Sequence, residues 1–128
     1  MLAGCMGSNM SEDQMTVDDR VQVSKFIQCV QLFRALDPNI RIGPVRSFLT
    51  VALNENMTVG EVARRTGSAV QTVSNHLRTL GEGQDKNGRP SLGLIASRRS
   101  PFDAREVVVR MTPKGHALVE RMRDITQG

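Results

Sequence analysis

The chain is poor in aromatic residues: among its 128 residues it has no Trp, no Tyr and only four Phe. Three of them, Phe26, Phe33 and Phe48, lie within helical patterns of apolar residues. Proteins that hold single-stranded nucleic acid stack its bases on exposed aromatic rings, so the composition disfavours this class. The core must instead be built from aliphatic side chains and from the seven Met residues.

Soft metal ligands are also scarce. The candidates are Cys5, Cys29, His76 and His116, and none of them shows a paired spacing such as Cys-x-x-Cys. We therefore predict no metal site and no cofactor. Two cysteines do not make a disulfide framework, which favours a reducing cytoplasm. Cys29 lies within an apolar helical pattern, so a buried, inert thiol is favoured over a peroxide-sensing one.

Catalytic and membrane motifs are missing as well. The sequence has no nucleophile elbow and no paired acidic motif, and Gly81-Glu82-Gly83 lacks the preceding strand that a phosphate-binding loop needs. An enzyme is therefore not predicted. No apolar run approaches transmembrane length, and the lipoprotein-like Leu2-Ala3-Gly4-Cys5 follows no basic or hydrophobic segment of adequate length. We expect neither a signal nor a membrane anchor.

Positive charge is concentrated in one segment of the chain. The net charge is +4, and residues 60 to 115 carry ten Lys or Arg against five Asp or Glu. Residues 1 to 59 are slightly acidic, and the charges of the last thirteen residues cancel. This asymmetry favours a polyanionic partner, although a basic solvated face is a common alternative.

At the start of the basic segment, residues 58 to 80 predict a short helix, a tight turn at Gly67 and a longer helix, which is a helix-turn-helix. Gly67 tolerates a turn conformation that residues with a β-carbon resist. Apolar residues recur at helical spacing on the side that should face the core: Val59, Val62, Ala63, Val70, Val73, Leu77 and Leu80.

The opposite side of the second helix is polar. Its short hydrogen-bonding groups and its arginine are what base edges and phosphates require. The predicted DNA-binding residues are Ser68, Gln71, Thr72, Asn75, Arg78 and Thr79, with His76 at the flank of the helix for a phosphate. An ordinary helical hairpin with a solvated polar face is the alternative.

We expect a flexible tail at residues 1–15 and one domain at residues 16–128. A first helix from Thr16 ends at Asp37-Pro38-Asn39 and has an apolar stripe wide enough for burial on two sides, with a second subunit as a candidate for one side. The stripe consists of Val23, Phe26, Ile27, Cys29, Val30, Leu32, Phe33 and Leu36. A second helix begins near Pro44 and should bury Val45, Phe48, Leu49, Ala52 and Leu53.

After a loop at residues 81–93, two strands at 94–98 and 105–111 are predicted, followed by a helix with Thr112 as its cap and Pro113 in its first position. Helices, a helix-turn-helix and a β-hairpin make a winged helix-turn-helix, a mainly α fold with a small β-hairpin wing. The wing residues expected to reach phosphates or a narrow minor groove are Arg98, Arg99 and Arg105.

Two motifs resemble the MarR family of bacterial transcription regulators. Asp103-Ala104-Arg105, followed by Met111-Thr112-Pro113-Lys114-Gly115, is similar to the wing signature of that family. The segment from Thr72 to Leu77 resembles its recognition helix, and the likeness covers roughly residues 20 to 125. The resemblance implies a homodimer on pseudo-palindromic double-stranded DNA, with Asp103 bracing the wing through an Arg and Arg105 in the minor groove. It also implies a small-molecule effector, phenolic or lipophilic, near the dimer interface.

The sequence departs from the family pattern in two places. The loop at residues 81–93 is longer than usual, and Lys86 and Arg89 are candidates for DNA contacts of its own. The last helix ends where family members continue into a further dimerising helix, so dimerisation should depend on the first helix and a short last one.

The leading hypothesis is therefore a cytoplasmic, homodimeric regulator that binds duplex DNA and represses transcription. One alternative is a winged helix used for protein–protein interaction within a larger assembly. Another is a DNA-binding accessory protein of a mobile element.

Overall fold

The computed structural model describes residues 14–85, 87–103 and 105–128, so most of the predicted tail, together with Cys5 and Lys86, lies outside the described residues. The helices are α1 (Val17–Leu36), α2 (Ile42–Leu53), α3 (Val59–Thr66), α4 (Val70–Leu80) and α5 (Pro113–Gln127). The strands are β2 (Met57–Thr58), β3 (Ile95–Arg99) and β4 (Val107–Met111). The predicted mainly α fold with a β-hairpin wing is confirmed.

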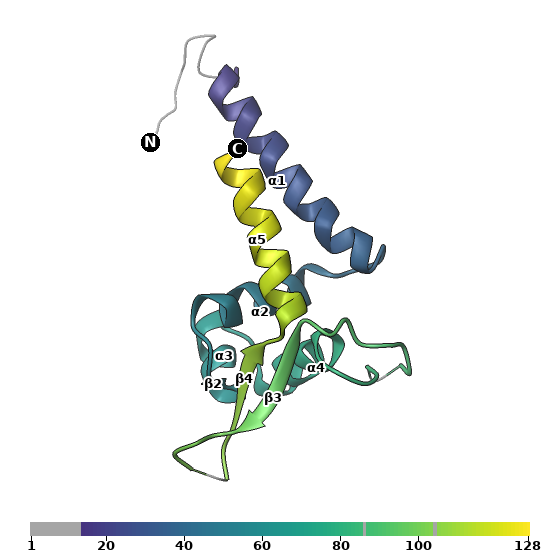
Figure 1. Cartoon of the computed structure of the whole chain (residues 1–128), viewed down its shortest axis with the longest axis vertical. Coiled ribbons are helices and arrows are strands. Elements are labelled where there is room, and N and C mark those ends of the chain that lie inside the picture. Colours follow the sequence, from purple (N-terminus) through teal and green to yellow (C-terminus); the bar gives the residue numbers. More distant parts are fainter. Residues whose placement is uncertain (1–13, 86, 104) are drawn as a thin grey trace.

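Two parts of the molecule differ in shape (Figure 1). The helices α1 and α5 lie side by side and form an arm that projects from the rest of the chain. The remaining elements, α2, α3, α4 and the three strands, form a body in which the helices pack on one another and on the sheet.

The arm begins where the sequence predicts. Thr16 caps α1 in a capping box, because its hydroxyl accepts from the Asp19 N–H at 3.0 Å and the Asp19 carboxylate accepts from the Thr16 N–H at 3.2 Å. Only three residues of α1, Cys29, Leu32 and Phe33, are buried. The other side of the predicted apolar stripe faces outward within a single chain: Val23, Phe26, Ile27 and Val30 are 47% to 67% exposed.

The buried face of α2 is rotated relative to the prediction. The helix begins at Ile42, and it buries Phe48 as expected, together with Pro44, Ser47 and Val51. The expected burial of Leu49 and Leu53 is wrong, since these side chains are 36% and 86% exposed. The reason is that α2 packs on α3 and α4 through the face that carries Ser47 and Val51, which turns Leu49 and Leu53 outward.

The helix-turn-helix is formed by α3 and α4. Thr58 and Glu61 form a second capping box at the start of α3, and Gly67 ends that helix in the left-handed conformation with φ 69°. The residues predicted to face the core do so, with the exception of Val70. This side chain is 55% exposed, because it lies in the first turn of α4, where the neighbouring residues are also exposed. Thr66 is buried and was not expected, and its hydroxyl donates to the Val62 carbonyl.

The strands form an antiparallel sheet in the order β2-β4-β3. The two-residue strand β2 was not predicted from the sequence, and it pairs Met57 with Val109. The β3–β4 hairpin pairs Ile95 with Met111 at its base and Arg99 with Val107 near its tip, and it extends away from the body as the wing (Figure 1). Thr112 caps α5 by accepting from the Gly115 N–H, as predicted.

The loop between α4 and β3 is held by its own hydrogen bonds. Leu92 and Leu94 donate their N–H groups to the carbonyls of Thr79 and Leu80, which ties the loop to the end of α4. Farther from α4 in the same loop, the backbone N–H of Asp85 donates to the Arg89 carbonyl, and Gln84 pairs with Pro90 in an isolated β-bridge. The loop is therefore a short folded extension at the C-terminal end of α4.

Candidate nucleic-acid interface

The outer face of α4 presents a polar surface without acidic residues. Gln71, Thr72 and Arg78 are exposed, and Ser68 and Asn75 are partly exposed. The sequence of α4, VQTVSNHLRTL, has no Asp or Glu, so no carboxylate on this helix would repel a phosphate. Thr79 donates its hydroxyl to the Asn75 carbonyl at 3.3 Å, so it is less available than the other hydroxyls. The face can therefore donate and accept hydrogen bonds along about two helical turns.

His76 lies on the inner flank of α4, which corrects the expectation that its ring is free for a phosphate. Its Nδ1 atom lies 3.2 Å from the Ser47 hydroxyl of α2. The ring also lies directly over Gly43, where a Cβ atom would come within 2.6 Å of two ring atoms. Burial lowers the pKa of His76 below its usual value, which favours the neutral ring. His76 therefore connects α4 to α2 and helps to set the position of α4.

The wing carries three arginines, as expected. Arg98 and Arg99 end β3, and Arg105 follows the tip, and all three are exposed. Asp103 pairs with Arg105, with 3.3 Å between Nε and the carboxylate, whereas the resemblance implies that Asp103 pairs with an arginine while Arg105 enters the minor groove. The Arg105 side chain is 91% exposed, and exposed ion pairs contribute at most about 1 kcal/mol. A phosphate or groove edge can therefore compete for this guanidinium.

The wing tip also presents an aromatic residue that is not among the site residues predicted from the sequence. Phe102 is 95% exposed. Its position beside Pro101 and Asp103 marks it as a loop residue, but nothing in its spacing distinguishes a functional ring from an incidental one. Only the three-dimensional position, between Arg99 and Arg105 at the end of the hairpin, makes it a candidate.

A cluster of Glu55, Arg110 and His116 connects the arm to the body. Glu55 follows α2, and its carboxylate lies 3.1 Å from Nε2 of His116 in α5 and 3.8 Å from Nε of Arg110 in β4. The cluster thus joins three elements at the base of α5. His116 was expected to be a surface or interface residue, and its pairing with Glu55 was not foreseen because the two residues are distant in sequence.

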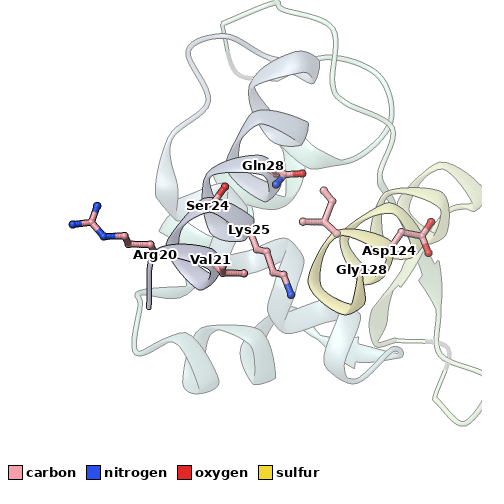
Figure 2. A pocket seen from close by; sticks show the side chains of 8 residues that line it. Arg20, Val21, Ser24, Lys25, Gln28, Asp124 and Gly128 are labelled. Atoms are coloured by element: carbon pink, nitrogen blue, oxygen red, sulfur yellow. The ribbon is translucent and has the colours of Figure 1, made fainter. Parts of the chain in front are cut away.

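The arm contains a surface pocket of about 530 Å³ between α1 and α5. Figure 2 shows Lys25 extending from α1 toward the last turn of α5, whereas Arg20 points away from it. Lys25 donates to the Thr126 carbonyl at 3.1 Å, which closes the gap between the two helices at this level. The lining residues are Arg20, Val21, Ser24, Lys25, Gln28, Asp124, Ile125 and Gly128.

Within residues 14–85, 87–103 and 105–128, no group of three His, Cys, Asp or Glu side chains could hold a metal ion. In the same part of the chain, no helix has the length and apolar character needed to cross a bilayer. Cys29 is a buried free thiol, as the sequence predicts.

Several solved structures share this architecture, whereas no protein-family model and no curated protein matches the sequence. The MepR–DNA complex of S. aureus has a TM-score of 0.63 at 21% identity, over 88% of this chain and 84% of MepR. A MarR transcriptional regulator from Methanosarcina mazei has a TM-score of 0.59 at 15% identity, over 84% and 70% of the two chains.

The chain has the fold of the MarR transcription regulators. A third structure of this fold is Bordetella bronchiseptica BpsR, a protein whose DNA binding is regulated by 6-hydroxynicotinic acid. It is 22% identical, with a TM-score of 0.51, over 84% of this chain and 76% of BpsR. Within the MarR fold of this chain, α4 is the helix that the resemblance indicated for DNA recognition, and β3 and β4 form the wing.

Proposed function

We propose that this protein is a transcription regulator that binds duplex DNA as a homodimer and represses transcription by occupying a promoter. The observation that carries the proposal is the acid-free polar face of α4, held in the same body as a wing with three exposed arginines. One protein of the same fold, MepR, has been solved with DNA. The site of action in this proposal is the cytoplasm.

The two parts of the interface have different tasks in this proposal. Gln71, Thr72 and Asn75 read base edges in the major groove, because amides and hydroxyls both donate and accept hydrogen bonds. Ser68 and Arg78 hold phosphates at either end of the helix. The wing residues Arg98, Arg99 and Arg105 bind phosphates and the minor groove, where cations are favoured.

The homodimer is supported by the arm. A stripe of Val23, Phe26, Ile27 and Val30 runs along α1 and is about half to two-thirds exposed in a single chain. A continuous apolar stripe of this kind marks an interaction surface. A second copy is the natural occupant, because a two-fold dimer places two recognition helices on successive major-groove half-sites.

A small-molecule effector is part of the same proposal, because the resemblance implies one and BpsR responds to 6-hydroxynicotinic acid. Its candidate site is the pocket between α1 and α5, where Lys25 supplies a positive charge. A bound molecule there would change how the two arm helices pack, and hence the spacing of the two DNA-binding bodies.

The test is selection from a random pool of labelled duplex DNA at several salt concentrations, followed by sequencing of the retained fraction. We expect enrichment of a palindrome and an affinity that falls steeply with salt, since cationic contacts release counterions. Absence of retention at low salt would contradict the proposal and would favour a protein-interaction module. Arg98, Arg99 and Arg105 would then be dispensable for its activity.

A further inference from the structure

The wing tip exposes the only aromatic ring outside the helices. Phe102 is 95% exposed, more than Leu53 at 86% or Ile42 at 81%, the next most exposed large apolar residues. Single exposed apolar residues are common and need no explanation by themselves. What distinguishes Phe102 is its position at the end of a hairpin whose other exposed side chains are mostly charged or polar.

The backbone that carries the ring is held in place. The Ser100 hydroxyl accepts from the N–H groups of Phe102 and Asp103, at 3.1 Å and 3.3 Å. The backbone N–H of Ser100 donates to the Glu106 carbonyl at 2.9 Å, and the backbone N–H of Glu106 donates to the Asp103 carbonyl at 3.0 Å. These bonds hold the backbone at Ser100, Phe102, Asp103 and Glu106 before any partner is bound, so that placing the ring in an interface costs little further ordering of that backbone.

The charges around the ring indicate the partner. Arg98 lies on the strand that leads to the tip, and Arg105 follows the tip on the other side. Asp103 and Glu106 also lie at the tip, but Arg98, Arg99 and Arg105 outnumber them, so the ring has a net positive surrounding, which fits a polyanion that also has an apolar recess. The minor groove of duplex DNA has both properties, because phosphates line its edges while sugars and stacked bases form its walls and floor. The same body carries α4, whose polar face has no acidic residue.

We propose that Phe102 is an apolar wedge, whose ring enters the minor groove beside the segment read by α4 and partly unstacks one base step. Phe is among the side chains that open base steps in this way. The inference rests on the proposed function, since it needs duplex DNA as the partner. It adds a source of specificity: pyrimidine–purine steps unstack most easily, so TA or CA is preferred at the wedge position, although no hydrogen bond reads it.

The test compares the full chain with Phe102→Ala and Phe102→Leu on the duplex retained from the random pool. We expect Phe102→Ala to lose about tenfold in affinity with an unchanged salt slope, because the ring carries no charge. Phe102→Leu keeps an apolar wedge and should remain within about threefold of the original. The matched control is Val107→Ala, which shortens another exposed apolar side chain on the same hairpin, at the first residue of β4, and should bind as the unchanged chain does.

A second readout detects the unstacking itself. The adenines flanking each half-site are replaced, one at a time, by 2-aminopurine, whose fluorescence rises when its base is unstacked. We expect a rise at one position with the unchanged chain and with Phe102→Leu, and none with Phe102→Ala. Equal affinities of Phe102→Ala and the unchanged chain, or no rise at any position, would overturn the wedge while leaving the DNA-binding proposal intact. Failure of the unchanged chain to bind any duplex would overturn both.

Discussion

Phe48 of the body and Phe26 of the arm differ in how much of each ring a single chain buries. In the body, Phe48 is fully buried and meets Phe33 of α1 edge to face, with 5.9 Å between the ring centroids. In the arm, Phe26 is 67% exposed, although it belongs to the same kind of helical apolar pattern. The core is completed within one chain, and Leu32 and Phe33 of α1 and Leu118 of α5 contribute to it. The outer stripe of α1 stays exposed in a single chain, and in the proposed homodimer a second copy covers it.

The largest expected effect contrasts these two rings directly. Phe48→Ala should lower the free energy of unfolding by about 3–5 kcal/mol at every protein concentration, because it leaves a cavity in the core. Phe26→Ala should have an effect that grows with protein concentration, because the ring is buried only in the dimer. Thermal unfolding of both variants at several concentrations measures this contrast. A concentration-independent loss for Phe26→Ala would show that α1 is not the dimer surface.

A smaller effect within the body tests how α4 is positioned. Gly43→Ala would place a Cβ atom against the His76 ring, so we expect a loss of about 1–3 kcal/mol in stability and weaker DNA binding. In the double variant Gly43→Ala/His76→Ala the ring is absent, and most of the loss caused by the alanine at position 43 should disappear. A double-mutant cycle measures the coupling. Additive losses would mean that the ring and the glycine do not constrain each other.

Arginines of the wing and of the arm should also differ in how much they contribute to DNA binding. Arg105→Ala in the wing should weaken DNA binding broadly and reduce the salt slope by about 1, because one phosphate-region contact is lost. Arg34→Ala removes the same charge from an exposed position at the end of α1 and should leave both quantities nearly unchanged. Binding titrations at several salt concentrations separate the two results. Similar changes in both variants would indicate a general charge effect rather than a wing contact.

The smallest effect is a dependence of body stability on pH. Burial lowers the pKa of His76, so the unfolded chain takes up this proton at a higher pH than the folded chain does. The contribution of the neutral ring is fully present above the unfolded value of about 6.5 and is lost as the pH falls below it. We expect His76→Gln to lose less stability than the unchanged chain between pH 7 and pH 5. The free energy of unfolding of both proteins is measured by denaturation at several pH values. An equal loss in the two proteins between pH 7 and pH 5 would contradict this role of the His76 ring.

The sequence predicts the features of this fold that depend on local chemistry. Thr16, Thr58 and Thr112 mark the helix starts through their hydroxyls, and Gly67 marks the turn through its left-handed φ. The positive charge of the wing and the lack of Asp and Glu in α4 can also be predicted from the sequence, because each feature lies within a short segment.

Features that depend on packing between distant segments could not be predicted. The buried face of α2 is set by where α3 and α4 lie, so Leu49 and Leu53 were misplaced. The strand β2 is too short for a pattern and exists only because β4 is beside it. His76 and Glu55 acquire their roles from partners 29 and 61 residues away, Ser47 and His116, which no spacing rule connects. Such contacts are visible only in three dimensions.

The most direct test of the central claim compares binding to a duplex with two half-sites and to the same duplex with one half-site scrambled, using the unchanged chain and Phe26→Asp/Val30→Asp. The account predicts that the unchanged chain binds the two-site duplex at least about a hundredfold more tightly than the one-site duplex, because both bodies of a dimer engage. The arm variant should bind the two duplexes about equally. Equal binding of both duplexes by the unchanged chain would contradict the account.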